Sequence, residues 1–168
     1  IRHFRPDVAL VDIRGNVPTR EQKLRDGQFE AILLAAAGLQ RLELDLSDLE
    51  VIRLNVKEFV PAPAQGVLAY QVNTADTATR RLLRAIHHPE VSAVTNIERR
   101  VLQLLDGGCQ LPLGVYCERD AVGHYHLWAA LAERWDGPLH RVQQSSSTTY
   151  ELAEKVVAEL REKLRQNA

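Results

Sequence analysis

Two short apolar runs, Val8–Ile13 and residues 29–34, are typical of buried strands. Between them, Thr19 and Gln22 form a capping-box pattern that predicts a helix start, and Gly27 predicts the end of that helix. A strand, a helix and a second strand in this order are typical of a parallel or mixed α/β sheet.

The middle of the chain is divided by a proline-rich segment. Residues 61–66 read Pro-Ala-Pro-Ala-Gln-Gly, a composition that breaks regular structure and predicts a hinge or a domain boundary. Strand and helix patterns lie on both sides of it: a helix at 35–42, strands at 51–56 and 67–72, and a helix at 74–87.

The last third of the chain has three consecutive strand patterns between two amphipathic helices. The expected elements are a helix at 91–105, strands at 113–118, 124–135 and 139–144, and a closing helix that begins at Thr148 with Glu151 in its capping box. Hairpin-linked strands flanked by helices predict a separate α+β unit.

The composition, 45% hydrophobic and 26% charged, is that of a globular chain. A formal net charge of -1 without a basic, aromatic patch argues against nucleic acid as a partner, and no apolar run approaches the roughly 20 residues of a membrane helix. The two cysteines, Cys109 and Cys117, form no disulfide framework, which favours the cytoplasm. The sequence contains no methionine, so we expect a processed or cloned piece of a longer protein.

A loop with two arginines precedes the first predicted helix. Arg14 and Arg20 stand where a strand would end and a helix would begin, and a helix start offers free amides to an anion. Since arginine can grip a carboxylate with two hydrogen bonds, the loop predicts a small acidic ligand, and Arg41 can point into the same crevice. The alternative, which loop chemistry leaves open, is that Arg14 and Arg20 pair with the surface acids Asp12 or Glu21.

Cys109 lies in a Gly-Gly-Cys loop directly after a predicted helix. Glycines leave a thiol approachable, so Cys109 is a candidate nucleophile or attachment point, although a lone loop thiol can also have no role. Cys117 falls within a strand and is interpreted as a packing residue. His124 and His126 share a strand face but lack a third ligand, so we expect no metal site.

Five motifs follow one another along nearly the whole chain. They are Arg14-Gly15-Asn16-Val17 with Thr19-Arg20, the segment 31–41 that includes Gly38-Leu39 and Arg41, Pro61–Gly66, Glu98-Arg99, and Gly107-Gly108-Cys109-Gln110 with Pro112 and Gly114. Together they resemble the successive signatures of the porphobilinogen deaminase, or hydroxymethylbilane synthase, family. The resemblance implies a transferase that condenses four porphobilinogen molecules, with loss of ammonia, into hydroxymethylbilane in haem biosynthesis.

The resemblance also implies roles for individual residues. Cys109 would carry a dipyrromethane cofactor through a thioether, and Arg14, Arg20 and Arg41 would bind the carboxylates of cofactor and substrate. The catalytic aspartate of the family belongs to an N-terminal region absent from this sequence. No catalytic residue is therefore assigned here, and the chain alone is expected to be inactive. The full-length protein is expected to be a monomer.

The expected fold class is α/β plus α+β. By resemblance, residues 1–60 are the later part of a second, periplasmic-binding-protein-like α/β domain, and 61–88 are a hinge and a segment returning to an absent first domain. Residues 89–168 are a C-terminal α+β domain with a three-stranded antiparallel sheet, and this domain carries the cofactor on its Gly-Gly-Cys loop. The chain departs from the family pattern in and after the hinge, at Ala64, Gln71 and Asn73.

Two other classes of function are weighed against this one. A non-catalytic small carboxylate-binding module would share the α/β architecture, but it would have no need of an exposed thiol on an added unit. A structural domain is the third possibility, and the arginines at a helix start argue mildly against it.

Overall fold

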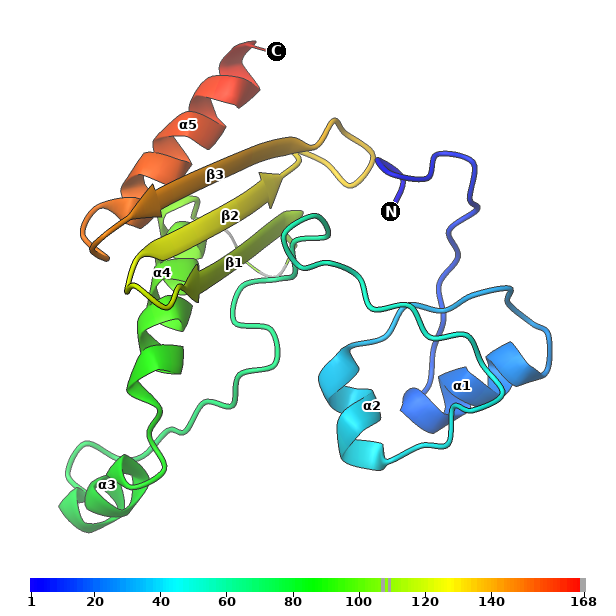
Figure 1. The fold of residues 1–168 in the computed structure, drawn as a ribbon, viewed down its shortest axis with the longest axis horizontal. Coiled ribbons are helices and arrows are strands. Elements are labelled where there is room, and N and C mark those ends of the chain that lie inside the picture. The colour runs from blue at the N-terminus through cyan, green and yellow to red at the C-terminus, as the bar shows by residue number, and fades with distance from the viewer. Residues whose placement is uncertain (107, 109, 167–168) are drawn as a thin grey trace. The chain divides into compact units, whose positions relative to one another are not determined.

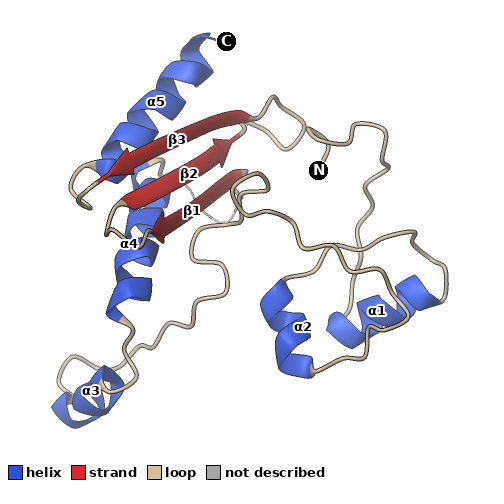
Figure 2. Cartoon of the chain, viewed as in Figure 1, coloured by secondary structure: helices blue, strands red, loops and turns tan. Residues whose placement is uncertain are grey.

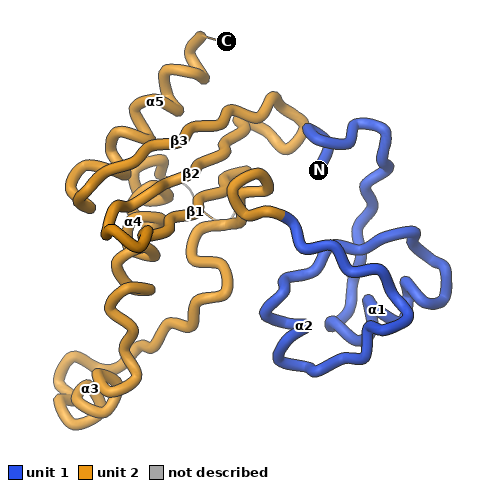
Figure 3. The backbone as a smooth tube through the Cα atoms, in the orientation of Figure 1, with its two compact units in different colours: residues 1–54 blue, residues 55–168 orange. Residues whose placement is uncertain are grey.

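The computed structural model describes residues 1–106, 108 and 110–166, and the chain divides into two compact units, Ile1–Leu54 and Asn55–Ala168 (Figure 3). Within the described residues, none of the helices is both long and apolar enough to cross a membrane.

The first unit contains two short helices, α1 (Val17–Arg25) and α2 (Ala36–Leu42), joined by irregular segments (Figure 2). The second helix approaches the first at a glycine, since a Cβ at Gly38 would lie 3.5 Å from Cγ2 of Val17. A polar cluster holds α1 to the segment after α2. Arg25 donates to Glu21 at 2.6 Å and to the Asp45 carbonyl at 2.7 Å, and it also pairs with Asp48.

The sheet expected for this half of the chain is not formed among the described residues. The segments predicted as strands have no ladder hydrogen bonds: 8–13, 29–34, 51–56 and 67–72. Apolar side chains within them stay exposed, such as Val11 at 69% and Ile52 at 74%. A buried strand exists only where neighbouring strands take up its amides and carbonyls, so a strand-like sequence without such neighbours remains irregular. The described residues therefore do not show the periplasmic-binding-protein-like sheet, which stays a prediction.

The second unit is an α+β arrangement, as predicted. Its elements are α3 (Thr77–Arg84), α4 (Pro89–Leu104), β1 (Leu113–Arg119), β2 (Tyr125–Leu131), β3 (His140–Ser146) and α5 (Leu152–Gln166). The strands form an antiparallel sheet in the order β1-β2-β3, and α4 and α5 cover one of its faces (Figure 1).

Three helix and strand boundaries in this unit differ from those predicted from the sequence. Pro89 starts α4, because its missing amide and fixed φ suit the first turn of a helix. The closing helix begins at Leu152 rather than Thr148, since Glu151 has a φ of 53° and interrupts the helical path. The second strand ends at Leu131, and Trp135, which was predicted inside it, is 71% exposed.

The core lies between the helix pair and the inner face of the sheet. Alternate residues of the strands point inward, so that Val115, Ala129 and Val142 form one buried row across the sheet. The helices fill the other side with residues at helical spacing: Ile97 and Val101 from α4, and Leu152, Val156 and Leu160 from α5. Burying each such aliphatic side chain contributes about 1.5–3 kcal/mol, which makes this core the main source of stability.

The outer face of the sheet is crossed by residues 57–64, which we call the strap. Arg141 of β3 donates to the Lys57 carbonyl at 2.7 Å, and Lys57 Nζ pairs with Glu118 of β1 at 2.7 Å. The same ammonium lies 4.8 Å from the ring centroid of Trp128 on β2. At the far end of the crossing, the Val115 amide donates to the Pro61 carbonyl at 2.8 Å. The strap therefore belongs to the second unit.

Candidate functional site

The turn before α1 is built by Asn16 and Gly15. The Asn16 side chain caps the helix by accepting from the Thr19 amide at 2.9 Å and from the Thr19 hydroxyl at 2.7 Å. Gly15 has a φ of 120°, and a Cβ there would lie 2.8 Å from Cγ2 of Thr19, so the turn requires glycine. The predicted cap at Thr19 is thus wrong, because Asn16 takes the cap and Pro18 falls within the first turn.

Arg20 lies beside a hollow at the start of α1. Its Nε donates to the Gly15 carbonyl at 2.8 Å, which fixes the base of the guanidinium against the turn. The hollow has a volume of about 540 Å³ and is lined mainly by apolar atoms of the α1 turn and of α2, with Arg20 as its only charged lining residue among those described. The Thr19 amide already donates to the Asn16 side chain, so an anion in the hollow would bind the Arg20 guanidinium rather than that amide.

Arg14 and Arg41 do not line this hollow. Both are exposed, and among the described residues neither guanidinium has a hydrogen-bond or ion-pair partner. The alternative in which Arg14 or Arg20 pairs with Asp12 or Glu21 is not observed among the described residues, and Glu21 pairs with Arg25 instead. Arg14 and Arg20 thus lie before and within the first turn region of α1, whereas Arg41 lies in the last turn of α2, and the hollow includes Arg20 alone of the three.

The predicted cofactor residue Cys109 and its neighbour Gly107 lie outside the described residues. The elements that flank the Gly-Gly-Cys loop are described: α4 ends at Leu104 before the loop and β1 begins at Leu113 after it. The other cysteine, Cys117, is 3% exposed in β1, and burial raises the pKa of its thiol to about 12. The prediction that Cys117 is a packing residue is confirmed.

Glu98 belongs to the Glu98-Arg99 motif, but the sequence alone assigned it no role of its own. It sits on the buried face of α4 at 7% exposure, and each carboxylate oxygen accepts one backbone amide. Oε2 accepts from Ala64 at 2.7 Å, and Oε1 accepts from Cys117 at 2.8 Å. Burial raises the pKa of Glu98, and the two amide hydrogen bonds act in the opposite direction. Its burial could have been predicted from its spacing, because Glu98 falls between Ile97 and Val101 on an otherwise apolar helix face.

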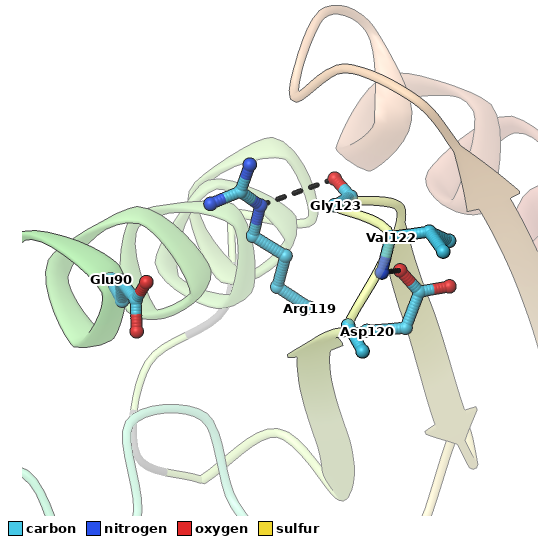
Figure 4. Close-up of a pocket in the computed structure, with 6 residues that line it drawn as sticks. Glu90, Arg119, Asp120, Val122 and Gly123 are labelled. Carbon is cyan, nitrogen blue, oxygen red and sulfur yellow. Dashed lines mark hydrogen bonds between the residues drawn. The ribbon is translucent and has the colours of Figure 1, made fainter.

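A second hollow, of about 420 Å³, lies at the turn between β1 and β2 (Figure 4). Figure 4 shows the Arg119 guanidinium directed at the Gly123 carbonyl, while the Asp120 side chain folds back onto the Val122 amide. Asp120 also pairs with His126, which holds the pKa of that carboxyl down at about 2. These charges close the turn and are not left for a ligand.

His124 and His126, the two histidines considered as metal ligands above, belong to no group of three or more potential metal ligands among the described residues. His126 instead bridges two side chains, with Nε2 2.9 Å from Asp120 and Nδ1 2.8 Å from the Ser145 hydroxyl. This bridge links the β1–β2 turn to β3.

Two family models match the chain. Residues 1–81 match the model described as porphobilinogen deaminase, dipyromethane cofactor binding domain, and residues 93–166 match porphobilinogen deaminase, C-terminal domain. The three arginines lie in the first match and Cys109 lies in the second.

Curated relatives agree with these matches. The chain is 33% identical over 159 residues to the porphobilinogen deaminase of Chloroherpeton thalassium, covering 94% of this chain and 50% of that protein. It is 38% identical over 151 residues to that of Roseiflexus castenholzii, covering 89% and 48%. A probable porphobilinogen deaminase of Methanocella arvoryzae is 47% identical over 118 residues, covering 70% and 37%.

The chain belongs to the porphobilinogen deaminase family. It spans about half the length of the curated relatives that it matches.

Proposed function

We propose that this chain is the C-terminal portion of a hydroxymethylbilane synthase, which condenses four porphobilinogen molecules with loss of ammonia and acts as a monomer. Family membership supports the reaction class. The observation that carries the proposal is Arg20, fixed by the Gly15 carbonyl beside a hollow at a helix start. That arrangement suits a small ligand with carboxylate groups.

Arg14, Arg20 and Arg41 act as carboxylate-binding residues for cofactor and substrate. A guanidinium keeps its charge at all physiological pH values and presents paired donors to a carboxylate. Arg14 and Arg41 have no protein partner among the described residues, so a ligand would not have to break an ion pair. Their task is to bind and orient anionic groups rather than to move protons.

The cofactor is a dipyrromethane attached to Cys109 through a thioether, and when attached it supplies the primer to which substrate units are added. The carboxylates of such a group could pair with the guanidinium groups proposed to bind them. The chemistry of the second cysteine supports the choice of Cys109. Cys117 is buried and its pKa is raised to about 12, so almost none of it is the thiolate that bond formation needs.

The chain by itself is proposed to be inactive, because the aspartate that manages protons in this family lies in a region outside it. Purified alone, it should consume no porphobilinogen. Product formation by the isolated chain would contradict this part of the proposal.

The decisive test is the intact mass of the denatured full-length protein, because a thioether survives denaturation and a reversibly bound ligand does not. We expect the mass of two additional pyrrole units in the wild type and in the matched control Cys117→Ala, and its loss in Cys109→Ser. An unmodified wild type that binds porphobilinogen reversibly would favour the carboxylate-binding module instead.

A second test addresses the arginines. Arg20→Gln should weaken porphobilinogen binding about tenfold or more, since a charge-assisted hydrogen bond contributes about 1.5–3 kcal/mol. The control is Arg53→Gln, an exposed arginine of the same unit away from the hollow. Equal porphobilinogen affinities for the two variants would show that Arg20 does not bind the substrate.

A further inference from the structure

We propose that Glu98 is a positioning residue that latches the strap to both elements flanking the Cys109 loop. The proposal concerns the backbone contacts of Glu98, and it rests on the proposed function only for its catalytic consequence. If Cys109 carries the cofactor, the latch couples the strap to the base of that loop.

The geometry of Glu98 is that of a connector. Its two oxygens serve two different segments: the strap residue Ala64 at 2.7 Å and the β1 residue Cys117 at 2.8 Å. No cation pairs with it among the described residues, so backbone amides alone compensate a carboxylate that is 7% exposed. Removing a carboxylate from water is costly, and an apolar residue could fill the same volume at lower cost. What the carboxylate adds is therefore the link between α4, β1 and the strap.

The strap is held from a second direction by close packing. At Gly114, an added Cβ would lie 2.4 Å from the Val60 carbonyl oxygen, so the strap backbone rests directly on the outer face of β1. One residue further on, the Val115 amide donates to the Pro61 carbonyl. The strap thus passes from the outer face of the sheet, around the edge of β1, to Glu98 on the opposite side.

The latch reaches both ends of the candidate cofactor loop. Glu98 is on α4, six residues before the end of that helix at Leu104, and Cys117 is on β1, four residues after its start at Leu113. Helix and strand are the stiff elements from which the loop departs and to which it returns. A displacement of the strap at Ala64 is therefore transmitted to both anchor points of the loop, and the strap and the loop base move as one body.

The first experiment measures amide hydrogen exchange in this chain for Glu98→Leu, Glu98→Gln and the matched control Glu154→Leu. Glu154 is a helical surface glutamate of the same unit, paired with Arg100. In Glu98→Leu we expect the Ala64 amide to exchange on the order of tenfold faster or more, because its buried acceptor is gone. The core amides of Leu127 and Ala129 should keep their protection, and the control should match the wild type.

Glu98→Gln retains one carbonyl oxygen and should restore protection at one of the two amides only. This variant also serves if Glu98→Leu does not fold. Unchanged exchange at Ala64 in folded Glu98→Leu, or at both Ala64 and Cys117 in folded Glu98→Gln, would overturn the proposal, as would a uniform loss of protection across the sheet.

The second experiment uses the full-length protein and separates cofactor loading from turnover. For Glu98→Gln we expect near-complete loading by denatured mass, but a several-fold lower kcat per loaded molecule. Normal turnover per loaded molecule would reduce Glu98 to a stability role and refute the positioning claim. If the wild type carries no adduct, the proposed function fails, while the exchange data still decide whether Glu98 latches the strap.

Discussion

Replacing Gly114 by alanine tests whether the strap rests on the sheet as described. The new Cβ would meet the Val60 carbonyl oxygen at 2.4 Å and two further Val60 atoms at 3.1 Å. The nearest atoms include strap backbone, which cannot rotate away as a flexible side chain would. The strap must either strain or lift from β1.

Both responses cost a similar amount of free energy. Overpacking a tight contact costs about 1–3 kcal/mol. Lifting the strap loses the hydrogen bond from Val115 to Pro61, and with it the Ala64 contact to Glu98, at about 1 kcal/mol for each. We therefore expect Gly114→Ala to lower the free energy of unfolding of the second unit by about 2 kcal/mol.

The assay is urea unfolding followed by tryptophan fluorescence, because Trp128 and Trp135 both lie in the second unit. With a denaturant slope of about 2 kcal/mol per molar, the midpoint should fall by roughly 1 M. The control is Gly38→Ala in the first unit, where the added Cβ would make an ordinary contact at 3.5 Å and the midpoint should not change. A midpoint for Gly114→Ala within 0.2 M or so of the wild type would refute the close approach of strap and sheet.

Three further predictions concern single side chains of the second unit. Ala64 has a φ of 60°, so Ala64→Gly should relieve left-handed strain and leave stability unchanged or raised by up to about 1 kcal/mol, as measured by thermal unfolding; a clear loss would contradict the strained turn. The Asp120 carboxyl has its pKa lowered to about 2 by His126, so its stabilising contribution is present above the ordinary value of 3.8 and is lost as the pH falls toward 2. An acid titration should accordingly show the stability difference between wild type and Asp120→Asn shrinking over that range, and a constant difference would speak against the pair. Finally, Cys117 should resist thiol-specific labelling in the folded chain and react only after unfolding, because its thiol is buried with a pKa of about 12; rapid labelling of folded Cys109→Ser would show this to be wrong.

The helices and strands from Pro89 onward were predictable because their determinants are local. Strand alternation at Val115 and Cys117 and helical spacing at Val156 and Leu160 each lie within one element, and they place the core correctly. The missed boundaries have local causes too. Glu151 adopts a positive φ that no periodicity reveals, and Asn16 outcompetes Thr19 as a cap.

The first unit shows where sequence patterns stop being sufficient. The run at Val8–Ile13 has the composition of a strand, but a strand is defined by pairing, and the described residues provide no partner for it. The arginine turn could be anticipated from Arg14 and Arg20 around a glycine, whereas the hydrogen bond from Arg20 to the Gly15 carbonyl depends on the path of the backbone in the turn, which the sequence does not reveal. The roles of these arginines and of Cys109 remain predictions, as do the expected domain boundaries at 60 and 88; the compact units themselves meet between Leu54 and Asn55.

The role of Glu98 could not be predicted for a different reason. A carboxylate on an apolar helix face has no favourable partner in its own sequence neighbourhood, and the two amides that donate to Glu98 belong to residues 34 positions before it and 19 positions after it. Only the tertiary structure shows that a buried charge there is satisfied.

The strap has a consequence for the solubility of the second unit. A three-stranded sheet has two edges, and an uncovered edge can recruit strands from other molecules and seed aggregation. On β1 three of the amides that face away from β2 have acceptors: Leu113 donates to Leu111, Val115 to Pro61 and Cys117 to Glu98. Among these three acceptors only the Pro61 carbonyl belongs to the strap, so a truncation that removed residues 57–64 would leave the Val115 amide open to intermolecular β-pairing.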